Sequence, residues 1–261
     1  MIEVRGLTYA IRQATILHDI HMTVRQGEMI GLIGPNGSGK TTLLKSIAHL
    51  HHLPEKTIWL KERPIETYAR KELARWMSVV FQDTSAAFDF TAEEIVQMGQ
   101  YAHKSPKTEA ERKEERARID EAFAKLEIEK LRTRSILEMS GGQRQLVMIA
   151  KMFVQQTPIY LLDEPISALD IYYQLLVLQL LREESEKGKT ILIVLHDLNL
   201  AARFCTTLAL LKEGEIVQVG APKEVLKESL LMASYDVVTT VEKNETVDAY
   251  QMLAIRPRKE E

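Results

Sequence analysis

The stretch from Gly34 to Thr41 constrains the fold of this chain more than any other part of its sequence. It reads GPNGSGKT, directly follows the apolar run Met29–Ile33 and leads into Thr41–Ile47, which has a helical pattern. A glycine-rich loop between a strand and a helix lets backbone N–H groups converge on a phosphate, and the helix dipole adds to the attraction. The octet therefore predicts a phosphate-binding loop within an α/β fold.

The residues of this loop have distinct predicted tasks. Lys40 offers its charge to the β- and γ-phosphates of a nucleoside triphosphate, the Thr41 hydroxyl is a ligand for Mg²⁺, and Thr42 can reach the α-phosphate. Such an octet arises by accident in roughly one chain of this length in a hundred. The predicted phosphate-binding residues are Gly34, Pro35, Asn36, Gly37, Ser38, Gly39, Lys40, Thr41 and Thr42.

Composition excludes several classes of protein. The 261 residues are 45% apolar and 27% charged, and a net charge of −3 gives no field that attracts a nucleic acid. With the single cysteine, Cys205, the chain forms no intramolecular disulfide, and we expect this side chain to be a small buried residue. The amino terminus lacks a secretion signal, and the apolar runs are far shorter than the ~20 residues of a membrane-spanning helix. We expect a globular chain that neither crosses a membrane nor binds nucleic acid.

Apolar runs that alternate with helical stretches predict a mainly parallel sheet, in which ligands gather at the carboxyl ends of the strands. Alternating patterns at the amino terminus predict an antiparallel β layer. The strands expected in the parallel sheet are Met29–Ile33, Ser78–Phe81, Ile159–Leu162 and Thr190–Leu195, and those of the β layer are Ile2–Val4 and Ile16–Val24.

Between Thr91 and about Arg134 the pattern becomes helical and predicts an inserted helical subdomain. Capping boxes begin two helices, one at Thr91 that Gly99 closes and one at Thr108. The second helix is highly charged and has an apolar face at Ile119, Phe123 and Leu126. After Pro222 we expect a short helix, then weak strands at Val237–Val241 and Tyr250–Ile255, and a frayed end at Arg256–Glu261.

Two carboxylates, Asp163 and Glu164, directly follow the predicted strand Ile159–Leu162. Successive side chains of a strand point in different directions, which suits a division of labour. We expect Asp163 to hold Mg²⁺, through water, and Glu164 to activate the water that attacks the γ-phosphate. The alternative for such a pair without a phosphate loop is a helix cap or a surface loop.

A second anion-binding helix start is predicted at Ser140-Gly141-Gly142-Gln143, ahead of a long helix over Arg144–Val154. The phosphate loop already supplies one complete phosphate site. The second helix start therefore suggests that Ser140, Gly141, Gly142 and Gln143 complete the site of another copy, in a head-to-tail dimer that shares two nucleotides.

Taken together, these elements resemble the ATP-binding subunits of ABC transporters, over roughly Ile2 to Leu226. The resemblance implies a P-loop NTPase ABC ATPase core with an N-terminal antiparallel β layer and an inserted helical subdomain. It implies one ABC ATPase domain over residues 1–261. Within it, 1–90 and 155–225 form the α/β core with the β layer, 91–154 form the helical subdomain with the signature motif, and 226–261 form a C-terminal extension.

The resemblance also assigns residues that none of the patterns above identifies. It implies that Gln82 senses Mg²⁺ and water, that Asp170 lies at the dimer interface, and that His196 contacts the γ-phosphate. At the position where this family commonly stacks an aromatic ring on adenine the chain has Ile11, with Tyr9 as the alternative if the strand register shifts. The implied catalytic residues are Glu164, His196 and Gln82; the Mg²⁺ ligands are Thr41, Gln82 and Asp163; and Ile11, Ser140–Gln143 and Asp170 join the phosphate loop in binding ATP.

Within this family, three stretches are similar to importers of ferric siderophores, haem and cobalamin: Ala168–Ile171, His196–Cys205 and Phe88–Gly99. The resemblance implies a homodimer at the cytoplasmic face of the membrane, bound to an integral permease and served indirectly by an extracytoplasmic substrate-binding protein. Exposed apolar residues near Phe88–Ile95 are the predicted permease-facing patch. The alternative for that patch is the core of the helical subdomain.

Three other functions compete with import. A soluble ABC ATPase of cluster assembly, translation or DNA repair works without a permease, but the chain has neither a long coiled coil nor a second cassette. A P-loop kinase or GTPase has no use for Ser140–Gln143. An inactive binding module is disfavoured because Lys40, Asp163, Glu164 and His196 are all present.

Overall fold

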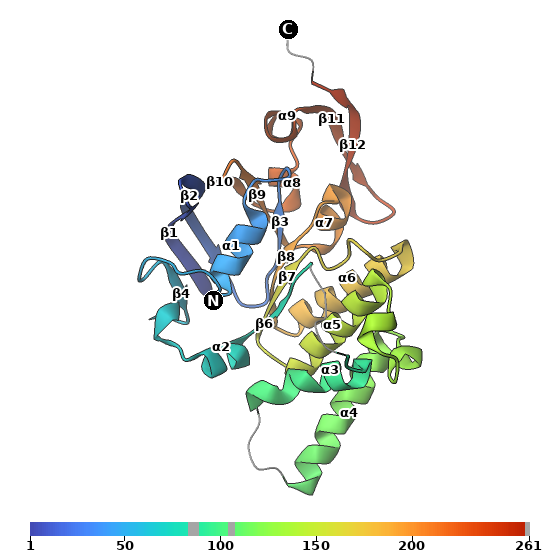
Figure 1. The fold of residues 1–261 in the computed structure, drawn as a ribbon. Helices are drawn as coiled ribbons and strands as arrows, with labels where there is room; N and C mark the ends of the chain where they lie inside the picture. Colours follow the sequence, from blue (N-terminus) through green and yellow to red (C-terminus); the bar gives the residue numbers. More distant parts are fainter. Residues whose placement is uncertain (83–88, 104–107, 259–261) are drawn as a thin grey trace. The chain divides into compact units, whose positions relative to one another are not determined.

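The computed structural model describes residues 1–82, 89–103 and 108–258 (Figure 1). The chain divides into two compact units. Unit 1 consists of Met1–Thr67 and Thr190–Glu261, and unit 2 consists of Tyr68–Lys189. The two ends of the chain thus build one unit together and the middle builds the other. These units do not follow the subdomain boundaries expected from the sequence, which stay a prediction.

Unit 1 contains the antiparallel layer predicted at the amino terminus. Strand β1 (Ile2–Ile11) pairs antiparallel with β2 (Ala14–Val24) on one edge and with β4 (Ile58–Leu60) on the other. Strand β4 continues the layer to the short β5 (Arg63–Pro64). The register of β1 against β2 shifts between Val4 and Ala10. Such shifts interrupt the alternation of apolar and polar residues, so this alternation predicted only Ile2–Val4 of β1.

The parallel strands of unit 1 form its second layer. Strand β3 (Met29–Ile33) lies between β8 (Thr190–Val194) and β9 (Thr207–Lys212) and runs parallel to both, while β10 (Glu215–Gly220) joins β9 antiparallel. All residues of β3 and β8 are buried, as expected for strands covered on both faces. Helix α1 (Lys40–Ile47) follows β3. Both the predicted parallel strands and the helix after the glycine-rich loop are confirmed.

The carboxyl-terminal part of unit 1 contains more helix than its sequence indicated. Helix α7 (Leu198–Phe204) follows β8, and two short helices, α8 (Pro222–Val225) and α9 (Glu228–Tyr235), lead to a hairpin of β11 (Val237–Asn244) and β12 (Ala249–Pro257). Only one short helix was expected here. Helix α9 has no side-chain cap at its start, so the usual signal for a helix amino terminus is missing.

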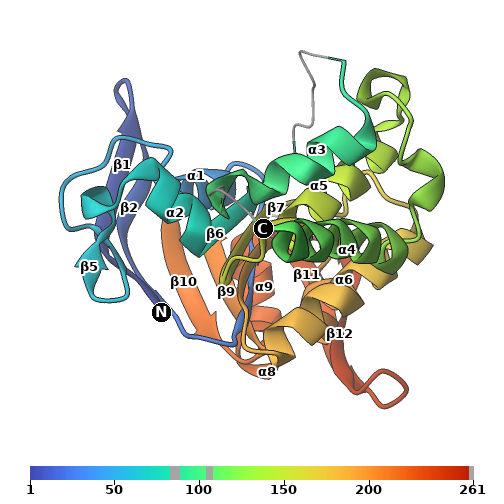
Figure 2. The same ribbon diagram turned by 90° about the horizontal axis from the view of Figure 1, so that it is seen from below.

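Unit 2 is mainly helical. Strand β6 (Met77–Val80) pairs in parallel with β7 (Ile159–Asp163), and 3-10 turns lie at Gly99–His103, Glu129–Leu131 and Ile136–Glu138. Helices α3 and α4 both pack on α5, beside one another in the view of Figure 2. The helices of this unit are α2 (Arg70–Trp76), α3 (Ala92–Met98), α4 (Glu109–Lys125), α5 (Gly141–Gln155) and α6 (Ile171–Glu186).

The predicted capping boxes begin α3 at Thr91 and α4 at Thr108, and each threonine hydroxyl accepts the backbone N–H of the glutamate three residues later. The predicted apolar face of α4 is buried at Ile119, Phe123 and Leu126. Cys205 is buried, as expected. Among the described residues, no helix has the length and apolar character needed to cross a bilayer.

Gly99 closes α3, as predicted, and its packing gives a further reason for glycine at this position. Its φ is −55°, and a 3-10 turn continues from it. A Cβ atom at Gly99 would lie 2.4 Å from the carbonyl oxygen of Lys151 on α5. Glycine is therefore required here by the close packing of α3 on α5.

Replacing Gly99 with alanine tests this packing. The new Cβ forces α3 away from α5, and we expect the free energy of unfolding to fall by about 1–3 kcal/mol, the usual cost of overpacking. Chemical denaturation measures the change. The control is Gly141→Ala, where the nearest atom to the new Cβ is 3.9 Å away. Equal stability of the Gly99→Ala variant and the original chain would contradict this explanation.

Candidate functional site

The phosphate loop of unit 1 has a backbone that only glycine can follow at two points. Gly34 has a φ of +147°, and a Cβ atom there would lie 2.1 Å from the carbonyl oxygen of Leu211. Gly39 has a φ of +100°, and a Cβ atom there would press on the Leu17 side chain at 2.8 Å. The loop is therefore fitted closely against β2 and the end of β9.

Hydrogen bonds hold the loop to its neighbours. The N–H of Gly214, in the turn between β9 and β10, donates to the carbonyl oxygen of Ser38 at 3.1 Å. The Gly214 carbonyl oxygen accepts the N–H of His18 on β2 at 2.8 Å. Gly214 therefore ties β2 to the phosphate loop. Gly214 was not predicted as part of the site, and its signal in the sequence is the Glu213-Gly214 turn.

Two polar side chains of the loop fit a phosphate ligand. The Lys40 ammonium group, with only 5% of the residue exposed, donates to the carbonyl oxygens of Gly34 at 2.8 Å and Pro35 at 2.9 Å. The Ser38 hydroxyl is buried and has no hydrogen-bond partner among the described residues. A buried cation and an unsatisfied hydroxyl within one loop match the oxygens of a phosphate, since buried polar groups normally have partners.

Two other predicted residues lie in unit 1. His196 is exposed and precedes Asp197, which caps the first backbone N–H groups of α7. Ile11 is 49% exposed at the end of β1. The ring of Tyr9, the alternative for adenine stacking, instead stacks on His51 with 4.5 Å between ring centroids. Tyr9 is thus already packed against another ring, and Ile11 stays the predicted adenine contact.

The acidic pair lies at the carboxyl end of β7 in unit 2. Asp163 is the last residue of this buried strand, and Glu164 follows with a φ of +50°, in the left-handed region. The Gln82 amide Nε2, just beyond the parallel neighbour β6, donates to Glu164 Oε2 at 2.8 Å. The hydroxyl of Ser167 donates to the Glu164 carbonyl oxygen at 3.0 Å. Two of the predicted catalytic residues, Gln82 and Glu164, therefore lie in direct contact.

The predicted second anion-binding site is an exposed helix start. Ser140 caps α5, accepting the N–H of Gln143 at 3.2 Å, while the Gln143 side chain accepts the N–H of Ser140 at 3.1 Å. A Cβ atom at Gly142 would lie 2.6 Å from the carbonyl oxygen of Ala168. Asp170 follows closely and caps α6 by accepting the N–H of Tyr173 at 3.1 Å. The segments Ser140–Gln143 and Ala168–Asp170 thus form one surface of unit 2.

The metal assignment involves residues of both units. Thr41 is in unit 1, and Gln82 and Asp163 are in unit 2. Within 1–82, 89–103 and 108–258, no three His, Cys, Asp or Glu side chains gather as metal ligands. A hydroxyl, an amide and a carboxylate still suit Mg²⁺, which keeps several waters and binds substrate phosphates. The roles of all these site residues stay predictions.

The predicted permease-facing patch needs a correction. Phe88 lies outside the described residues, Phe90 is 37% exposed, and both Ala92 and Ile95 are buried. An exposed apolar patch was therefore wrong for Ala92 and Ile95, because these side chains form the core between α3 and α5. These two residues therefore belong to the core of the helical subdomain, which was the alternative prediction for this segment.

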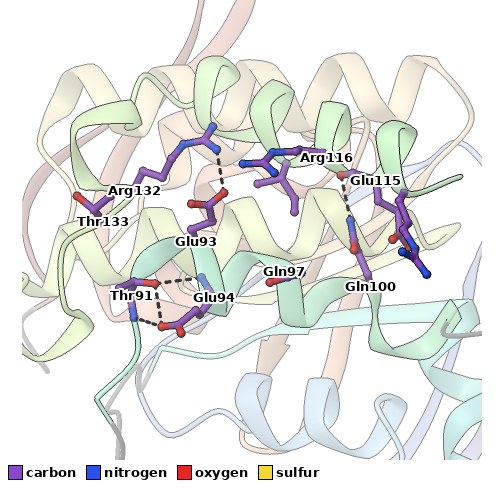
Figure 3. Close-up of a pocket in the computed structure, with 11 residues that line it drawn as sticks. Thr91, Glu93, Glu94, Gln97, Gln100, Glu115, Arg116, Arg132 and Thr133 are labelled. Carbon is purple, nitrogen blue, oxygen red and sulfur yellow. Dashed lines mark hydrogen bonds and ion pairs between the residues drawn. The ribbon is translucent and has the colours of Figure 1, made fainter. Parts of the chain in front are cut away.

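A charged pocket of about 600 Å³ lies between α3 and α4 instead. Figure 3 shows carboxylate and guanidinium groups facing one another across it, with Arg132 donating to Glu93 at 3.1 Å. Arg132 also pairs with Asp120 at 2.7 Å. The lining residues are Thr91, Glu93, Glu94, Gln97, Gln100, Arg112, Glu115, Arg116, Ile119, Arg132 and Thr133.

A family model and two known proteins are similar to most of this chain. The family model described as ABC transporter matches residues 17–167. The ferric enterobactin transport ATP-binding protein of Escherichia coli K12 is 39% identical over 88% of this chain and 84% of its own length. The hemin import ATP-binding protein of Streptomyces coelicolor is 38% identical over 88% of this chain and 81% of its own length.

Two further matches extend the comparison. The cobalamin import ATP-binding protein of Halobacterium salinarum is 32% identical over 90% of this chain, and the chain spans 58% of the length of that relative. Among solved structures, a dimeric ATP-binding cassette bound to ADP and phosphate superposes with a TM-score of 0.75 and 29% identity. That match covers 85% of this chain and 99% of the cassette.

Proposed function

Since the chain belongs to the ABC transporter family, we propose that it is the ATP-hydrolysing subunit of an importer with a separate membrane permease. The proposal that the chain binds ATP rests on the phosphate loop. In this loop the buried Lys40 ammonium group and the unsatisfied Ser38 hydroxyl lie beside a helix amino terminus. In this proposal the phosphate loop of unit 1 and the acidic strand end of unit 2 act on the same nucleotide.

In this proposal the residues of the two units have different roles in hydrolysis. Lys40 and the loop N–H groups hold the β- and γ-phosphates, and Glu164 takes a proton from the attacking water. Gln82 fixes the orientation of that carboxylate through its hydrogen bond of 2.8 Å. His196 contacts the γ-phosphate. Thr41, Gln82 and Asp163 hold Mg²⁺, which supplies charge neutralisation on the phosphates when it is bound.

Two copies of the chain form the working unit of this proposal. The exposed start of α5, capped by Ser140, offers backbone N–H groups to an anion outside its own chain. Asp170 lies on the same surface of unit 2, at the start of α6. The nucleotide of one copy is thus completed by Ser140–Gln143 of the other. ATP drives closure because it binds the closed pair more tightly than the open one.

The proposed partner and cargo rest on the relatives of this chain. These relatives are named for the import of ferric enterobactin, hemin and cobalamin. We therefore assign this chain to uptake of a ferric siderophore, haem or cobalamin, at the cytoplasmic face of the membrane and supplied by an extracytoplasmic binding protein. The charged pocket between α3 and α4 is the surface that we assign to the permease.

Uptake after deletion of the gene tests the import proposal. We expect cells without the gene to lose uptake of one of three labelled cargoes: iron supplied as a ferric siderophore, iron supplied as haem, or cobalamin. The intact gene restores uptake and the Glu164→Gln gene does not, because import needs hydrolysis. Unchanged uptake of all three cargoes would contradict this transport class, even if the purified protein hydrolyses ATP.

A further inference from the structure

The turn between β9 and β10 has a backbone that its own sequence fixes. Lys212 pairs with Glu215 across this hairpin, so the turn consists of two residues, Glu213 and Gly214. Their φ values are +49° and +81°, and a two-residue turn with both φ angles positive matches the twist of the strands that it joins. The hairpin therefore holds the Gly214 backbone in one orientation.

Gly214 is also enclosed by β2. A Cβ atom at Gly214 would lie 2.4 Å from the carbonyl oxygen of Ile16 and 2.7 Å from Cδ2 of the His18 ring. The Gly214 carbonyl oxygen accepts the N–H of His18 at 2.8 Å. Strand β10 lies beside β2 in unit 1, as Figure 1 shows. The turn and the neighbouring strand together fix the direction in which the Gly214 N–H points.

This N–H reaches the phosphate loop. It donates to the carbonyl oxygen of Ser38 at 3.1 Å, and the N–H of Ser38 donates to the carbonyl oxygen of Pro35 at 3.2 Å. Both backbone groups of Ser38 are therefore held. The Ser38 hydroxyl has no partner among the described residues. Ser38 is thus fixed through its backbone while its side chain stays available to a ligand.

Fixing the Ser38 carbonyl group also fixes the next N–H of the loop. No peptide bond among the described residues is cis, so the C=O of Ser38 and the N–H of Gly39 point in opposite directions. The Gly39 N–H therefore points away from the turn, and it has no hydrogen-bond partner within residues 1–82, 89–103 and 108–258. Gly39 directly precedes α1, so this N–H joins the free donors at the amino terminus of the helix.

We propose that the β9–β10 turn is a positioning element of the ATP site, in which Gly214 orients the Ser38–Gly39 peptide so that the Gly39 N–H faces the bound phosphates. The inference rests on the proposed function of the phosphate loop. Without the hydrogen bond from Gly214 this peptide can rotate, and ATP binding then has to restore its orientation at a cost in conformational entropy. Gly214 itself does not touch the nucleotide, and its effect reaches the phosphates through the backbone of the loop.

The most direct test removes the Gly214 N–H alone. Cys205 is the single cysteine of the chain, so native chemical ligation can join a synthetic peptide of residues 205–261 to residues 1–204 without changing the sequence. A peptide with an ester bond in place of the amide between Glu213 and Gly214 lacks this N–H but keeps the carbonyl oxygen that binds His18. The control is the same semisynthetic chain with the normal amide.

We expect the ester chain to bind ATP and inorganic tripolyphosphate more weakly by a common factor of about 2–10, the effect of one lost hydrogen bond. Competition with a fluorescent ATP analogue measures both affinities. A common factor shows that the contacts to the phosphates are affected, because tripolyphosphate has no base. KM for ATP rises by the same factor while kcat changes less, since Glu164 and Gln82 belong to unit 2.

Gly214→Ala tests the same contact in the recombinant full chain. The new Cβ atom presses on Ile16 and His18, which moves the turn and breaks the hydrogen bond to Ser38. We expect the affinities for ATP and tripolyphosphate to fall by at least the factor found for the ester chain. The matched control is Gly188→Ala, where φ is also positive, at +95°, but no described atom beyond the neighbouring residues lies within 4 Å of the new Cβ. This control keeps the original affinities.

Thermal unfolding without nucleotide separates positioning from stability. A lower Tm of the ester chain with unchanged affinities for ATP and tripolyphosphate would overturn the proposal. If circular dichroism shows that the ester chain does not refold, the affinities of Gly214→Ala decide by the same criterion. A failure of the proposed function has a different signature. In that case the original chain itself does not bind ATP, or Lys40→Ala binds it equally well.

Discussion

Glu164→Gln is expected to reduce ATP hydrolysis by about 10²–10⁴-fold, the usual contribution of a general base. The glutamine amide is nearly isosteric with the carboxylate but takes up no proton from water. Its carbonyl oxygen still accepts a hydrogen bond, so the 2.8 Å contact from Gln82 is retained. ATP binding therefore persists while turnover stops, and steady-state phosphate release measures the loss.

The same variant reports on the dimer. With hydrolysis blocked, two chains stay closed around ATP, and size-exclusion chromatography of purified Glu164→Gln shows an ATP-dependent dimer. Glu186→Gln is the matched control, since Glu186 makes a surface ion pair with Arg182 at 2.8 Å and such pairs contribute little. Hydrolysis at the original rate in Glu164→Gln would remove Glu164 from the role of base.

Local signals in the sequence predicted most elements that surround the candidate site. Capping boxes at Thr91, Thr108 and Ser140 all begin helices, because the cap is satisfied by a residue only three positions later. The buried strands β3 and β7 were found because a continuous apolar run suits a strand covered on both faces. In both cases the physical cause lies within a few residues.

Features that depend on distant partners were missed or misread. The reason for glycine at position 99 is the Lys151 carbonyl oxygen on another helix. Burial of Ala92 and Ile95 depends on the packing of α3 on α5. None of these contacts leaves a local pattern, so sequence periodicity alone does not reveal them.

The phosphate loop contains both residues that local sequence signals identify and contacts that depend on distant partners. Its glycines, Lys40 and Thr41 are recognisable by spacing alone because the phosphate imposes that spacing. The atoms that hold the loop in shape, the Gly214 N–H and the Leu211 carbonyl oxygen, come from β9 and the turn after it. Sequence therefore identifies the groups that meet the ligand more readily than the groups that support them.

Lys40→Ala is expected to weaken ATP binding by about 10–100-fold, because a hydrogen bond from a charged donor contributes about 1.5–3 kcal/mol. Isothermal titration calorimetry of the purified variant with ATP measures the change. Lys45→Ala, which removes a cation from the last turn of the same helix, is the matched control and keeps the affinity within about twofold.

The loss in Lys40→Ala has to be separated from damage to the loop, because the ammonium group also satisfies the carbonyl oxygens of Gly34 and Pro35. Lys40→Arg makes that separation, since it keeps the positive charge but not the point-like ammonium group that fits between these oxygens and a phosphate. If the charge alone matters, Lys40→Arg restores most of the affinity; if the fitted geometry matters, as we expect in this narrow loop, it stays at least tenfold weaker. ATP affinity equal to that of the original chain in Lys40→Ala would contradict the assignment of this loop to the phosphates.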